Sequence, residues 1–308
     1  MILRLGSVGD DVRKLQAKLK DLGLYAGPID GIFGGATELA VRKFQKKNGL
    51  KVDGIVGPKT YSLLLSEEEP SRTEILPLDL RCLTLTGTFE TGRPPPECFS
   101  AITGNFDGQG ISFGALQWNF GQGSLQVLLK DMLSDYRDVM EEIFGEHITV
   151  IEEVLKDKES AMEFANSIQH PIRHFIYEPW RGMFKELGRT REFQNIQLRH
   201  ANKIYNRAQN LSREYGLKTE RAIALMFDII VQCGGIKKAT EAYLRSELKD
   251  QEEAIKLELI AKRVSEQVNP RWQTDVYDRK MCIARGRGFV HGVWYDLEEQ
   301  FMIRLVEV

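Results

Sequence analysis

The sequence predicts a mainly α-helical chain made of a small domain and a larger one. Apolar residues recur every three to four positions over most of the 308 residues, which is the period of an amphipathic helix. Glycine and proline concentrate between positions 87 and 123, where this period is lost. Residues 66–72 are charged, contain a proline and carry no apolar period. We therefore expect a first domain at 1–65, a linker at 66–80 and a second domain at 81–308.

The first domain contains a repeated turn motif. Residues 30–37 read Asp-Gly-Ile-Phe-Gly-Gly-Ala-Thr, and residues 53–60 read Asp-Gly-Ile-Val-Gly-Pro-Lys-Thr. In each copy Asp-Gly favours a tight turn, and the threonine can cap the helix that follows. We expect three short helices joined by these two turns, with Asp30 and Asp53 as structural turn residues. Apolar residues at helical spacing mark the first two helices: Val12, Leu15, Leu19 and Leu22, then Leu39, Ala40, Val41 and Phe44.

The second domain is predicted to be helical around one glycine-rich region. The helical period covers residues 127–144, 148–164, 190–215, 219–232 and 237–268. Residues 105–119 contain three glycines and indicate a small β hairpin. Non-helical segments on a helical scaffold often carry function, so we expect the functional site there.

Composition and charge exclude several classes of protein. Basic and acidic residues are interleaved, so no nucleic-acid partner is indicated. The N-terminus lacks the features of a signal peptide, and no apolar run is long enough for stable membrane insertion. We expect a monomer that is synthesised in the cytoplasm and needs no cofactor or metal. The scattered cysteines are expected to be reduced, with a Cys82–Cys98 bridge as the alternative; they are Cys82, Cys98, Cys233 and Cys282.

Two acidic residues of the glycine-rich region are candidates for acid–base chemistry. Glu90 lies in Leu85-Thr86-Gly87-Thr88-Phe89-Glu90, an apolar setting that suits a protonated acid. Asp107 lies in Asn105-Phe106-Asp107-Gly108-Gln109-Gly110, a polar setting that suits an ionised carboxylate. Cleavage of a glycosidic bond uses such a pair, because one group protonates the leaving oxygen and the other activates water. The pair therefore indicates glycoside chemistry.

Most of the first domain follows one known sequence pattern. Leu5-Gly6-Ser7-Val8-Gly9 leads to Val12-Arg13-Lys14-Leu15-Gln16 and then to the two Asp-Gly copies. With these motifs, residues 3–65 resemble the peptidoglycan-binding domain of cell-wall hydrolases. The resemblance implies a three-helix fold that docks on glycan or stem peptide without performing chemistry. It makes bacterial peptidoglycan the expected partner.

The region around the two acidic residues resembles a second family. A glutamate at the end of a helix, followed by a loop and then Asp107-Gly108-Gln109-Gly110-Ile111-Ser112, is similar to the catalytic core of family-46 chitosanases. Those enzymes belong to the lysozyme superfamily. The resemblance implies that Glu90 is the general acid, that Asp107 is the general base, and that Ser112 helps to hold the attacking water in an inverting hydrolysis. The family has threonine at the position of Ser112, so this chain keeps the hydroxyl and loses the methyl group.

A third similarity concerns the end of the hairpin. Gly114-Ala115-Leu116-Gln117 looks like the Gly-x-x-Gln signature of lytic transglycosylases, which use one glutamate and no base. Both families agree on Glu90, and they disagree on Asp107. We expect four residues to contact the glycan: Gln109, Gln117, Trp118 and Asn119. By resemblance to the chitosanases, Asp228 and Arg279 are expected to form an ionic network beneath Glu90.

Together these patterns predict a muramidase-type glycosidase of the phage endolysin kind, which degrades peptidoglycan. The alternatives are a lytic transglycosylase, a chitosanase, and a non-catalytic wall-binding or phage structural protein. A zinc site at His170 and His174 is disfavoured because Pro171 interrupts the helix between them. Packing is expected for His291. A Cys98 peptidase is disfavoured because nothing around Cys98 lowers the pKa of its thiol.

Overall fold

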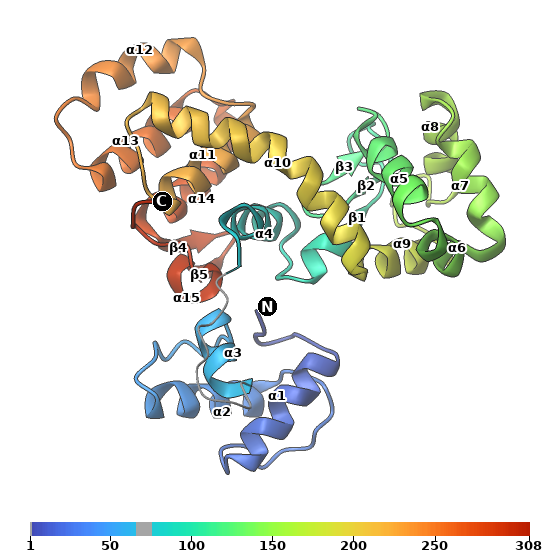
Figure 1. Ribbon diagram of the computed structural model, residues 1–308, viewed down its shortest axis with the longest axis horizontal. Coiled ribbons are helices and arrows are strands. Elements are labelled where there is room, and N and C mark those ends of the chain that lie inside the picture. The colour runs from blue at the N-terminus through green and yellow to red at the C-terminus, as the bar shows by residue number, and fades with distance from the viewer. Residues whose placement is uncertain (1, 66–75) are drawn as a thin grey trace. The chain divides into compact units, whose positions relative to one another are not determined.

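Figure 1 shows the computed structural model, which describes residues 2–65 and 76–308. These residues fold mainly into α-helices with a few short strands, so the predicted fold class is right. They form two compact units. Unit 1 combines Met1–Arg81, Lys218–Leu225 and Ala239–Val308, and unit 2 combines Cys82–Leu217 and Met226–Lys238. Most of the predicted linker falls on residues 66–75, which lie outside the described residues.

The N-terminal part of unit 1 is a three-helix module, residues 2–65. Its helices are α1 (Asp10–Asp21), α2 (Gly35–Lys47) and α3 (Pro58–Leu65), which pack together in Figure 1. Removal of apolar side chains from water is the main force that stabilises such a module. The shared core consists of Leu3, Val12, Leu15, Leu19, Tyr25, Phe33, Ala40, Val41, Phe44, Val56 and Leu64.

Two residues of the apolar pattern that marked these helices are exposed and lie outside this core. Leu22 is exposed and lies just beyond the last residue of α1, Asp21, where it is the C-cap of the helix. Leu39 is exposed because neighbouring residues of a helix point about 100° apart. Its neighbours Ala40 and Val41 occupy the core side of α2. The apolar period therefore located both helices but assigned one residue too many to each.

A buried glutamine organises the first repeated turn. Gln16 of α1 donates from Nε2 to Asp30 Oδ1 (2.8 Å), to Ile32 O (3.0 Å) and to Thr37 Oγ1 (3.2 Å). Its Oε1 accepts from the Gly31 N–H (2.9 Å). The hydrogen bond from Gln16 is the main reason why the pKa of Asp30 lies below its ordinary value. Asp30 thus acts within the module as a turn residue.

The second repeated turn is built in the same way around a second glutamine. Gln45 of α2 donates from Nε2 to Asp53 Oδ1 (2.9 Å), to Ile55 O (2.9 Å) and to Thr60 Oγ1 (3.4 Å). Its Oε1 accepts from the Gly54 N–H (2.9 Å). The module is therefore an internal duplication in which each copy pairs one helix with one Asp-Gly turn.

The threonine of the first copy has a different role from the predicted one. Thr37 lies inside α2, and the N-cap of this helix is Gly34. The hydroxyl of Thr37 accepts from Gln16 instead of capping the helix. Sequence alone does not separate these roles, because a threonine oxygen accepts from a backbone N–H and from a side-chain amide alike.

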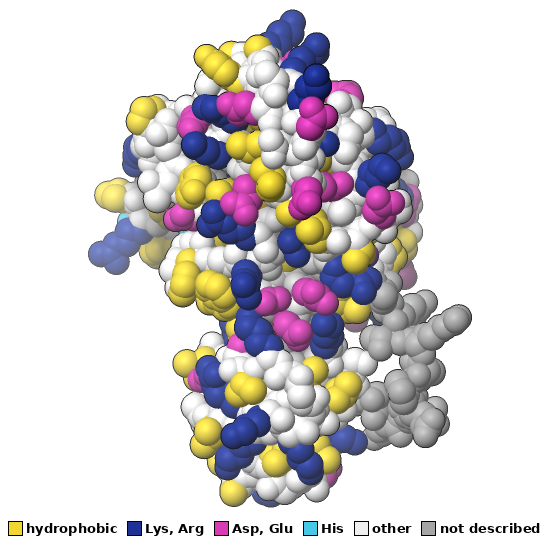
Figure 2. All heavy atoms as spheres, turned by 90° about the vertical axis from the view of Figure 1, so that its left-hand side faces the viewer, with side chains coloured by type: hydrophobic (Ala, Val, Ile, Leu, Met, Phe, Trp, Pro, Cys, Tyr) yellow, Lys and Arg dark blue, Asp and Glu magenta, His cyan; other side chains and the backbone are white. Residues whose placement is uncertain are grey.

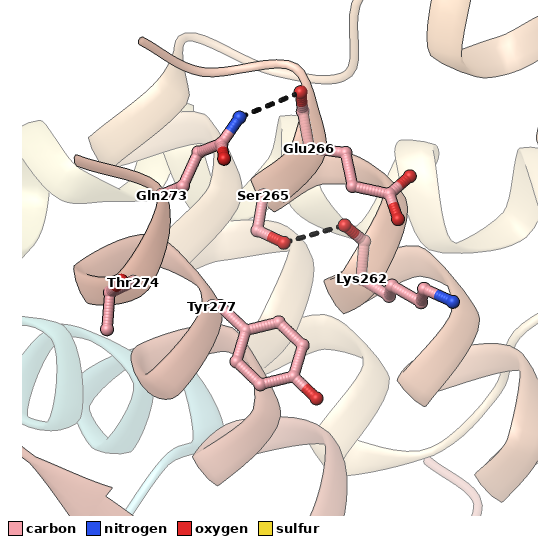
Figure 3. Close-up of a pocket in the computed structure, with 6 residues that line it drawn as sticks. All are labelled: Lys262, Ser265, Glu266, Gln273, Thr274 and Tyr277. Atoms are coloured by element: carbon pink, nitrogen blue, oxygen red, sulfur yellow. Dashed lines mark hydrogen bonds between the residues drawn. The ribbon is translucent and has the colours of Figure 1, made fainter. Parts of the chain in front are cut away.

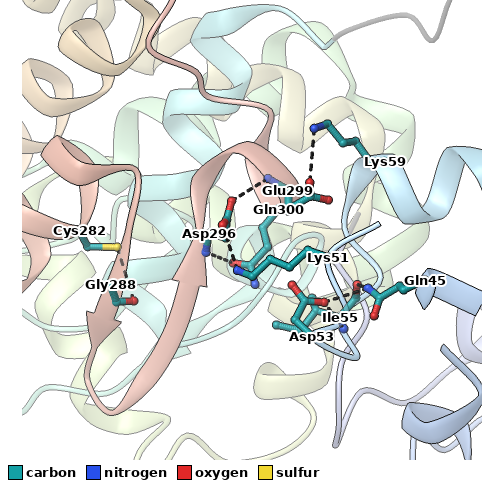
Figure 4. Close-up of polar contacts among 10 residues, drawn as sticks. All are labelled: Gln45, Lys51, Asp53, Ile55, Lys59, Cys282, Gly288, Asp296, Glu299 and Gln300. Carbon is teal, nitrogen blue, oxygen red and sulfur yellow. Dashed lines mark hydrogen bonds and ion pairs between the residues drawn. The ribbon is translucent and has the colours of Figure 1, made fainter. Parts of the chain in front are cut away.

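The module packs against the C-terminal end of unit 1. Lys51 Nζ lies 2.9 Å from Asp296 Oδ2, and Lys59 Nζ lies 3.1 Å from Glu298 Oε1 and 3.3 Å from Glu299 Oε1. Figure 4 shows Lys51 and Lys59 pointing toward Asp296 and Glu299. These groups are half-buried to exposed, so the ion pairs contribute orientation more than free energy of folding.

Beside these ion pairs, the backbone at Gly57 comes very close to the backbone at Glu299. A Cβ atom added at Gly57 would be 2.2 Å from the carbonyl oxygen of Glu299, a distance that no side chain tolerates. Lys51 Nζ also lies 5.4 Å from the centre of the Trp294 ring, within the range of a cation–π contact. The second copy of the duplication thus contacts the C-terminal end, as does Arg4, whose guanidinium lies 6.0 Å from the centre of the Tyr295 ring.

The rest of unit 1 is mainly helical and contains a β hairpin. Helices α13 and α14 lie side by side in Figure 1 and pack along each other. Strands β4 and β5 pair antiparallel, from Arg287 opposite Asp296 to Val290 opposite Val293. The elements are α12 (Lys238–Glu247), α13 (Glu253–Glu266), η3 (Pro270–Trp272), α14 (Gln273–Arg285), β4 (Arg287–Val290), β5 (Val293–Asp296) and α15 (Leu297–Phe301).

A buried ion pair joins the first turns of α4 (Leu78–Thr91) and α11 (Glu220–Cys233). Arg81 Nη2 donates to Glu220 Oε1 (2.8 Å), and the Arg304 N–H donates to Glu220 Oε2 (3.0 Å). Burial by itself raises the pKa of Glu220, but the hydrogen bonds from Arg81 and Arg304 outweigh it. The pKa of Glu220 therefore lies below its ordinary value.

This lowered pKa predicts how stability depends on pH. A carboxyl group with a lower pKa in the folded state stabilises the fold above its unfolded pKa of about 4.3, and this contribution is lost as pH falls through the folded value. We expect Glu220→Gln to lower the free energy of unfolding at neutral pH and to flatten its decline below about pH 4.3. Urea unfolding between pH 7 and pH 3 measures both effects. The exposed Glu214→Gln is the control, and equal pH profiles for the two variants would contradict the prediction.

Unit 2 holds the remaining helices around a three-stranded sheet. Helices α4 and α11 contribute residues to both units. In Figure 1 the three strands lie beside α5 and the first turns of α10. The other elements are η1 (Glu97–Ser100), β1 (Ile102–Thr103), β2 (Ser112–Phe113), β3 (Trp118–Asn119), α5 (Ser124–Asp135), α6 (Arg137–Phe144), η2 (Gly145–His147), α7 (Ile148–Val154), α8 (Lys158–Ser167), α9 (Trp180–Arg189) and α10 (Arg191–Glu214).

Three of the five predicted helical segments are interrupted. Tyr136 separates α5 from α6 with φ −143° and ψ 51°. Asp157 separates α7 from α8, because its side chain accepts from the Ser160 N–H (2.8 Å) and starts a new helix. Asp250 has a positive φ of 58° between α12 and α13. The apolar period persists across such breaks, so it overestimates helix length.

Helix α4 was not among the predicted helices. Its residues Leu83, Leu85, Thr86, Thr88 and Phe89 are all buried. A helix that is buried on every side has no polar face, so the three-to-four period is missing. The alternation of threonine with larger residues also resembles a strand. The chitosanase resemblance did place a helix end at Glu90, and α4 ends at the next residue, Thr91.

Charged side chains are spread over the surface. On the face shown in Figure 2, Lys and Arg side chains alternate with Asp and Glu side chains, and no large patch of one sign forms there. Among residues 2–65 and 76–308, no helix combines the length and hydropathy needed to cross a bilayer.

Candidate functional site

A small antiparallel sheet in unit 2 carries most of the residues predicted for the site. Strand β2 is central, and Ser112 pairs with Thr103 of β1 and with Asn119 of β3. The next residue, Phe113, points into the core, where its ring stacks on Phe193 at a centroid distance of 5.1 Å. Because side chains alternate along a strand, Ser112 points to the opposite face. Ser112 is half-buried there.

The loop between β1 and β2 carries Asp107 at its exposed tip. The Gln109 N–H donates to Asp107 Oδ1 (3.0 Å), which closes a tight turn. The Gly110 N–H donates to Asn105 Oδ1 (2.8 Å) across the base of the loop. Gly108 has a positive φ of 80°, a conformation that glycine adopts without strain. The loop is thus a defined structure that presents Asp107 to solvent.

The turn between β2 and β3 carries Gln117, which has a positive φ of 52°. The Thr103 hydroxyl donates to Gln117 Oε1 (2.9 Å), and Gln117 Nε2 donates to Gly114 O (2.9 Å). Trp118 is half-buried and packs against the core of unit 2. Asn119 is buried, and its Oδ1 accepts from the Gln122 N–H (2.9 Å). Through these contacts, Gln117, Trp118 and Asn119 help to hold the β2–β3 hairpin in shape.

Glu90 lies in the last turn of α4 and is half-buried. One turn earlier, Gly87 touches the β2–β3 turn: a Cβ atom added at Gly87 would lie 2.8 Å from Ala115 Cβ. Only glycine at this position lets the helix approach so closely. Gly87 thus brings the end of α4 that bears Glu90 against the hairpin that follows Ser112.

This contact yields a prediction for Gly87→Ala. The added methyl group meets a rigid neighbour, because Ala115 Cα and O are both within 3.2 Å of the new atom. Overpacking of this kind costs about 1–3 kcal/mol, which exceeds the gain of roughly 1 kcal/mol that alanine brings to a helix. We expect a net loss of unfolding free energy in urea. The control is Gly35→Ala in α2, where the new Cβ meets no atom within 4 Å and stability should not fall.

Gln197 of α10 was not predicted, and it holds two parts of this region together. Gln197 is completely buried. Its Oε1 accepts from the Ala115 N–H (2.9 Å), and its Nε2 donates to Phe99 O (3.0 Å). A glutamine on an apolar helix face was the only available signal, and it does not reveal partners 82 and 98 positions away. Gln197 thus fixes the β2–β3 turn relative to η1.

The two residues expected beneath Glu90 are both buried. Asp228 of α11 accepts a hydrogen bond from Thr86 Oγ1 (3.0 Å). Thr86 precedes Glu90 by four residues, so the two side chains share one face of α4. Arg279 lies in α14, which belongs to unit 1. The proposed pairing of Asp228 with Arg279 stays a prediction.

Cys98 is unsuited to nucleophilic chemistry. It is completely buried, and this burial raises the pKa of its thiol far above the ordinary value. None of the four cysteines, all of which lie in the described residues, forms a disulfide bond, so the alternative of a Cys82–Cys98 bridge is wrong for this structure. Three of them are buried, and Cys233 is partly exposed.

The histidines have structural surroundings. His170 Nδ1 accepts from the Ile172 and Arg173 N–H groups, both at 3.1 Å. His291 occupies the two-residue turn of the β4–β5 hairpin and contacts Asp275. Over the described ranges 2–65 and 76–308, no cluster of three or more His, Cys, Asp or Glu residues could hold a metal ion.

A groove of about 300 Å³ lies between α13 and α14, and none of the predicted site residues lines it. Figure 3 shows two of its polar side chains, Gln273 and Ser265, bonded to nearby backbone. Gln273 Nε2 donates to Glu266 O (3.3 Å), and Ser265 Oγ donates to Lys262 O (2.6 Å). These donors cap helix ends, so the groove does not present a set of polar groups converging on a ligand.

Comparison with known proteins identifies the module. Residues 8–64 match the family described as "Putative peptidoglycan binding domain". The N-terminal module belongs to this family. Over 64 residues the chain is 47% identical to a spore cortex-lytic enzyme of Bacillus cereus, a match that covers 21% of this chain and 25% of that protein. Over 56 residues it is 54% identical to the N-acetylmuramoyl-L-alanine amidase CwlM of Mycobacterium tuberculosis, which covers 18% and 14%. The chain thus spans a quarter or less of these two relatives.

The peptidoglycan-binding module is joined to a second known fold. A solved chitosanase complex structure matches with a TM-score of 0.50 and 15% sequence identity, covering 71% of this chain and 95% of that one. At this identity the likeness is one of fold. The expectation of a peptidoglycan-binding domain combined with a chitosanase-like fold is therefore confirmed.

Proposed function

We propose that the chain is a cell-wall hydrolase that cleaves glycosidic bonds in peptidoglycan. One observation carries the proposal: a peptidoglycan-binding module and a chitosanase-like fold occur in the same chain. The module supports the wall as substrate. It does not select the bond, because it is shared with relatives named as a spore cortex-lytic enzyme and as an amidase. The bond is assigned from the residues of the second domain.

In the proposed reaction, Glu90 is the general acid and Asp107 is the general base. Glu90 donates its proton to the glycosidic oxygen as the bond from the anomeric carbon to that oxygen breaks. A water molecule attacks the same carbon from the opposite face and gives one proton to Asp107. Ser112 Oγ helps to orient this water. The products are a new hydroxyl on one fragment and an inverted reducing end on the other.

Three structural features support these roles. Glu90 lies at the end of a buried helix, and Gly87 brings that end against the β2–β3 turn. Asp107 stands on an exposed, hydrogen-bonded turn where it can contact water. Ser112 lies on the central strand and points away from the core. We further propose that Gln109, Gln117, Trp118 and Asn119 line the glycan side of this sheet.

The test is digestion of purified bacterial walls, followed by mass spectrometry of the soluble fragments. We expect loss of turbidity and fragments with reducible amino-sugar ends, and nuclear magnetic resonance should show that the first-formed end is inverted. Fragments with anhydro ends would indicate a lytic transglycosylase reaction, which needs no general base, and would contradict the role of Asp107. Release of stem peptides from intact glycan strands would indicate that the chain is an amidase and not a glycosidase. Walls that stay turbid and intact would overturn the enzyme proposal in favour of a binding protein.

The proposed cleavage is compatible with two biological roles. A phage-type endolysin and a bacterial wall enzyme would catalyse the same cleavage, so fragment analysis does not separate them. Lysis of host cells during expression, when a membrane pore is opened, would support the endolysin role. Absence of lysis under those conditions would contradict that role while leaving the cleavage itself untouched.

A further inference from the structure

An aromatic surface adjoins the loop that carries Asp107. Phe106 precedes Asp107 and is 71% exposed. Its ring meets that of His174 edge to face, at a centroid distance of 5.1 Å. Apolar side chains gathered at the surface mark interaction sites more often than chance. We define the aromatic surface as Phe106, Ile172, His174, Phe175 and Tyr177; of these, Ile172 is 81% exposed, and Phe175 and Tyr177 are also exposed.

The turn that bears the other four residues is compact. The His170 N–H donates to Phe175 O (2.9 Å), and the His174 N–H donates to His170 O (2.9 Å). The Phe175 ring lies 5.4 Å from the Tyr177 ring in an edge-to-face arrangement. The aromatic side chains are therefore held on one short, hydrogen-bonded turn.

The Asp107 loop and this turn are fixed to each other. A Cβ atom added at Gly104 would lie 1.9 Å from His174 O, so the two backbones are in direct contact. The Asn105 N–H donates to Gln169 Oε1 (2.8 Å), and Gln169 is almost completely buried. Asn105 Nδ2 also donates to Asn166 Oδ1 (3.1 Å). Phe106 and Asp107 therefore hold a defined position beside the turn, which is the preorganisation that a binding site requires.

The charge of this region indicates which sugar polymer it fits. Between residues 101 and 124 the only Asp, Glu, Lys or Arg side chain is that of Asp107, and between residues 169 and 177 it is that of Arg173. Amides and aromatic rings supply most of the other large side chains in this segment. A polymer of free amino sugars is a polycation and favours several carboxylates in its binding site. N-acetylated sugars are neutral, and they offer an apolar face to aromatic rings and an amide to hydrogen-bonding side chains.

We propose that the aromatic surface is a subsite for neutral, N-acetylated amino sugars of a glycan strand. A sugar ring packs its apolar face on Phe106, and the strand continues from there past Asp107 to the bond that is cut. This inference rests on the proposed function for the direction of the strand. The subsite itself rests on exposure, contact geometry and charge, so it can be tested by binding alone.

The experiment is isothermal titration of the full chain with a hexamer of N-acetylglucosamine and with a hexamer of glucosamine. It uses Glu90→Gln as the parent, so that the ligand is not consumed. We expect Phe106→Ala to weaken binding of the acetylated hexamer about 3- to 10-fold, the range of an aromatic contact. Any binding by the module is the same in both proteins and cancels in the comparison. Phe106→Trp should restore affinity, because it keeps the ring.

Phe289→Ala is the matched control, because Phe289 is 60% exposed and lies on β4 of unit 1. Its affinity should equal that of the parent. Equal affinities of Phe106→Ala and the parent would overturn the subsite, and so would tighter binding of the glucosamine hexamer. If the parent sediments with neutral phospholipid vesicles and Phe106→Ala does not, the aromatic surface binds membranes instead of a glycan. If Phe106→Ala weakens binding but the unmutated chain leaves walls intact, the proposed function fails and the subsite stands.

Discussion

The Glu90→Gln variant is expected to clear purified walls about 100 to 10,000 times more slowly than the unmutated chain, the range that one general acid contributes. Glutamine has the shape of glutamate but cannot donate a proton to the departing oxygen. Glu90 is half-buried at the end of α4, so the substitution removes the proton donor and has little effect on packing. The rate of turbidity loss measures the effect, and the urea midpoint verifies that the fold is intact.

Glu97→Gln is the matched control for this variant. Glu97 is also half-buried, and it lies seven residues further along the chain at the start of η1. The same chemical change there should leave the clearing rate within about twofold of the unmutated chain, as for most substitutions outside a site. Full activity in Glu90→Gln would remove the basis of the proposed mechanism. Equal losses in both variants would mean that charge, and not proton donation, is the cause.

Replacing Gln197 by leucine is expected to lower the free energy of unfolding by about 2–6 kcal/mol. Leucine has a similar volume, but it leaves the Ala115 N–H and the Phe99 carbonyl without the hydrogen bonds that Gln197 provides. Each buried polar group left unpaired costs about 1–3 kcal/mol. Urea unfolding at pH 7 measures the loss. Activity should fall as well, because the β2–β3 turn loses its anchor.

Gln209→Leu on the same helix is the control for Gln197→Leu. Gln209 is half-exposed, so its amide can bond to water in the folded and unfolded states alike. Its effect should stay within about 0.5 kcal/mol. A loss of that small size in Gln197→Leu would show that the turn holds its shape without the amide, and that another group carries the positioning role.

The module could be predicted from sequence in most respects because its signals are local. The Asp-Gly turns lie within a few residues of the helices that they start, so spacing alone located them. Its hidden feature is the bonding of Gln16 and Gln45 across 14 and 8 positions to Asp30 and Asp53. Those glutamines read as ordinary polar residues of an amphipathic helix, because sequence does not show which side chains are buried.

The candidate site was only partly accessible from sequence. The resemblance to the chitosanases placed Glu90 at a helix end, the glycine-rich composition placed Asp107 on a turn, and both positions agree with the observed elements. The contacts that hold these elements come from distant parts of the chain. Gln197 bonds to Ala115, and Gln169 bonds to Asn105, over 82 and 64 positions. A pattern within one segment cannot reveal a partner that folding brings in from another.

The duplication inside the module has become unequal. Gly57 of the second copy is pressed against the Glu299 backbone, whereas a Cβ atom at Gly34, its counterpart in the first copy, meets no atom within 4 Å. Lys59 engages Glu298 and Glu299, and its counterpart is Ala36, which has no charge to offer. The two copies therefore differ in their surroundings: the second is anchored to the C-terminal end, and the first leaves its corresponding surface exposed to solvent at Gly35 and Ala36.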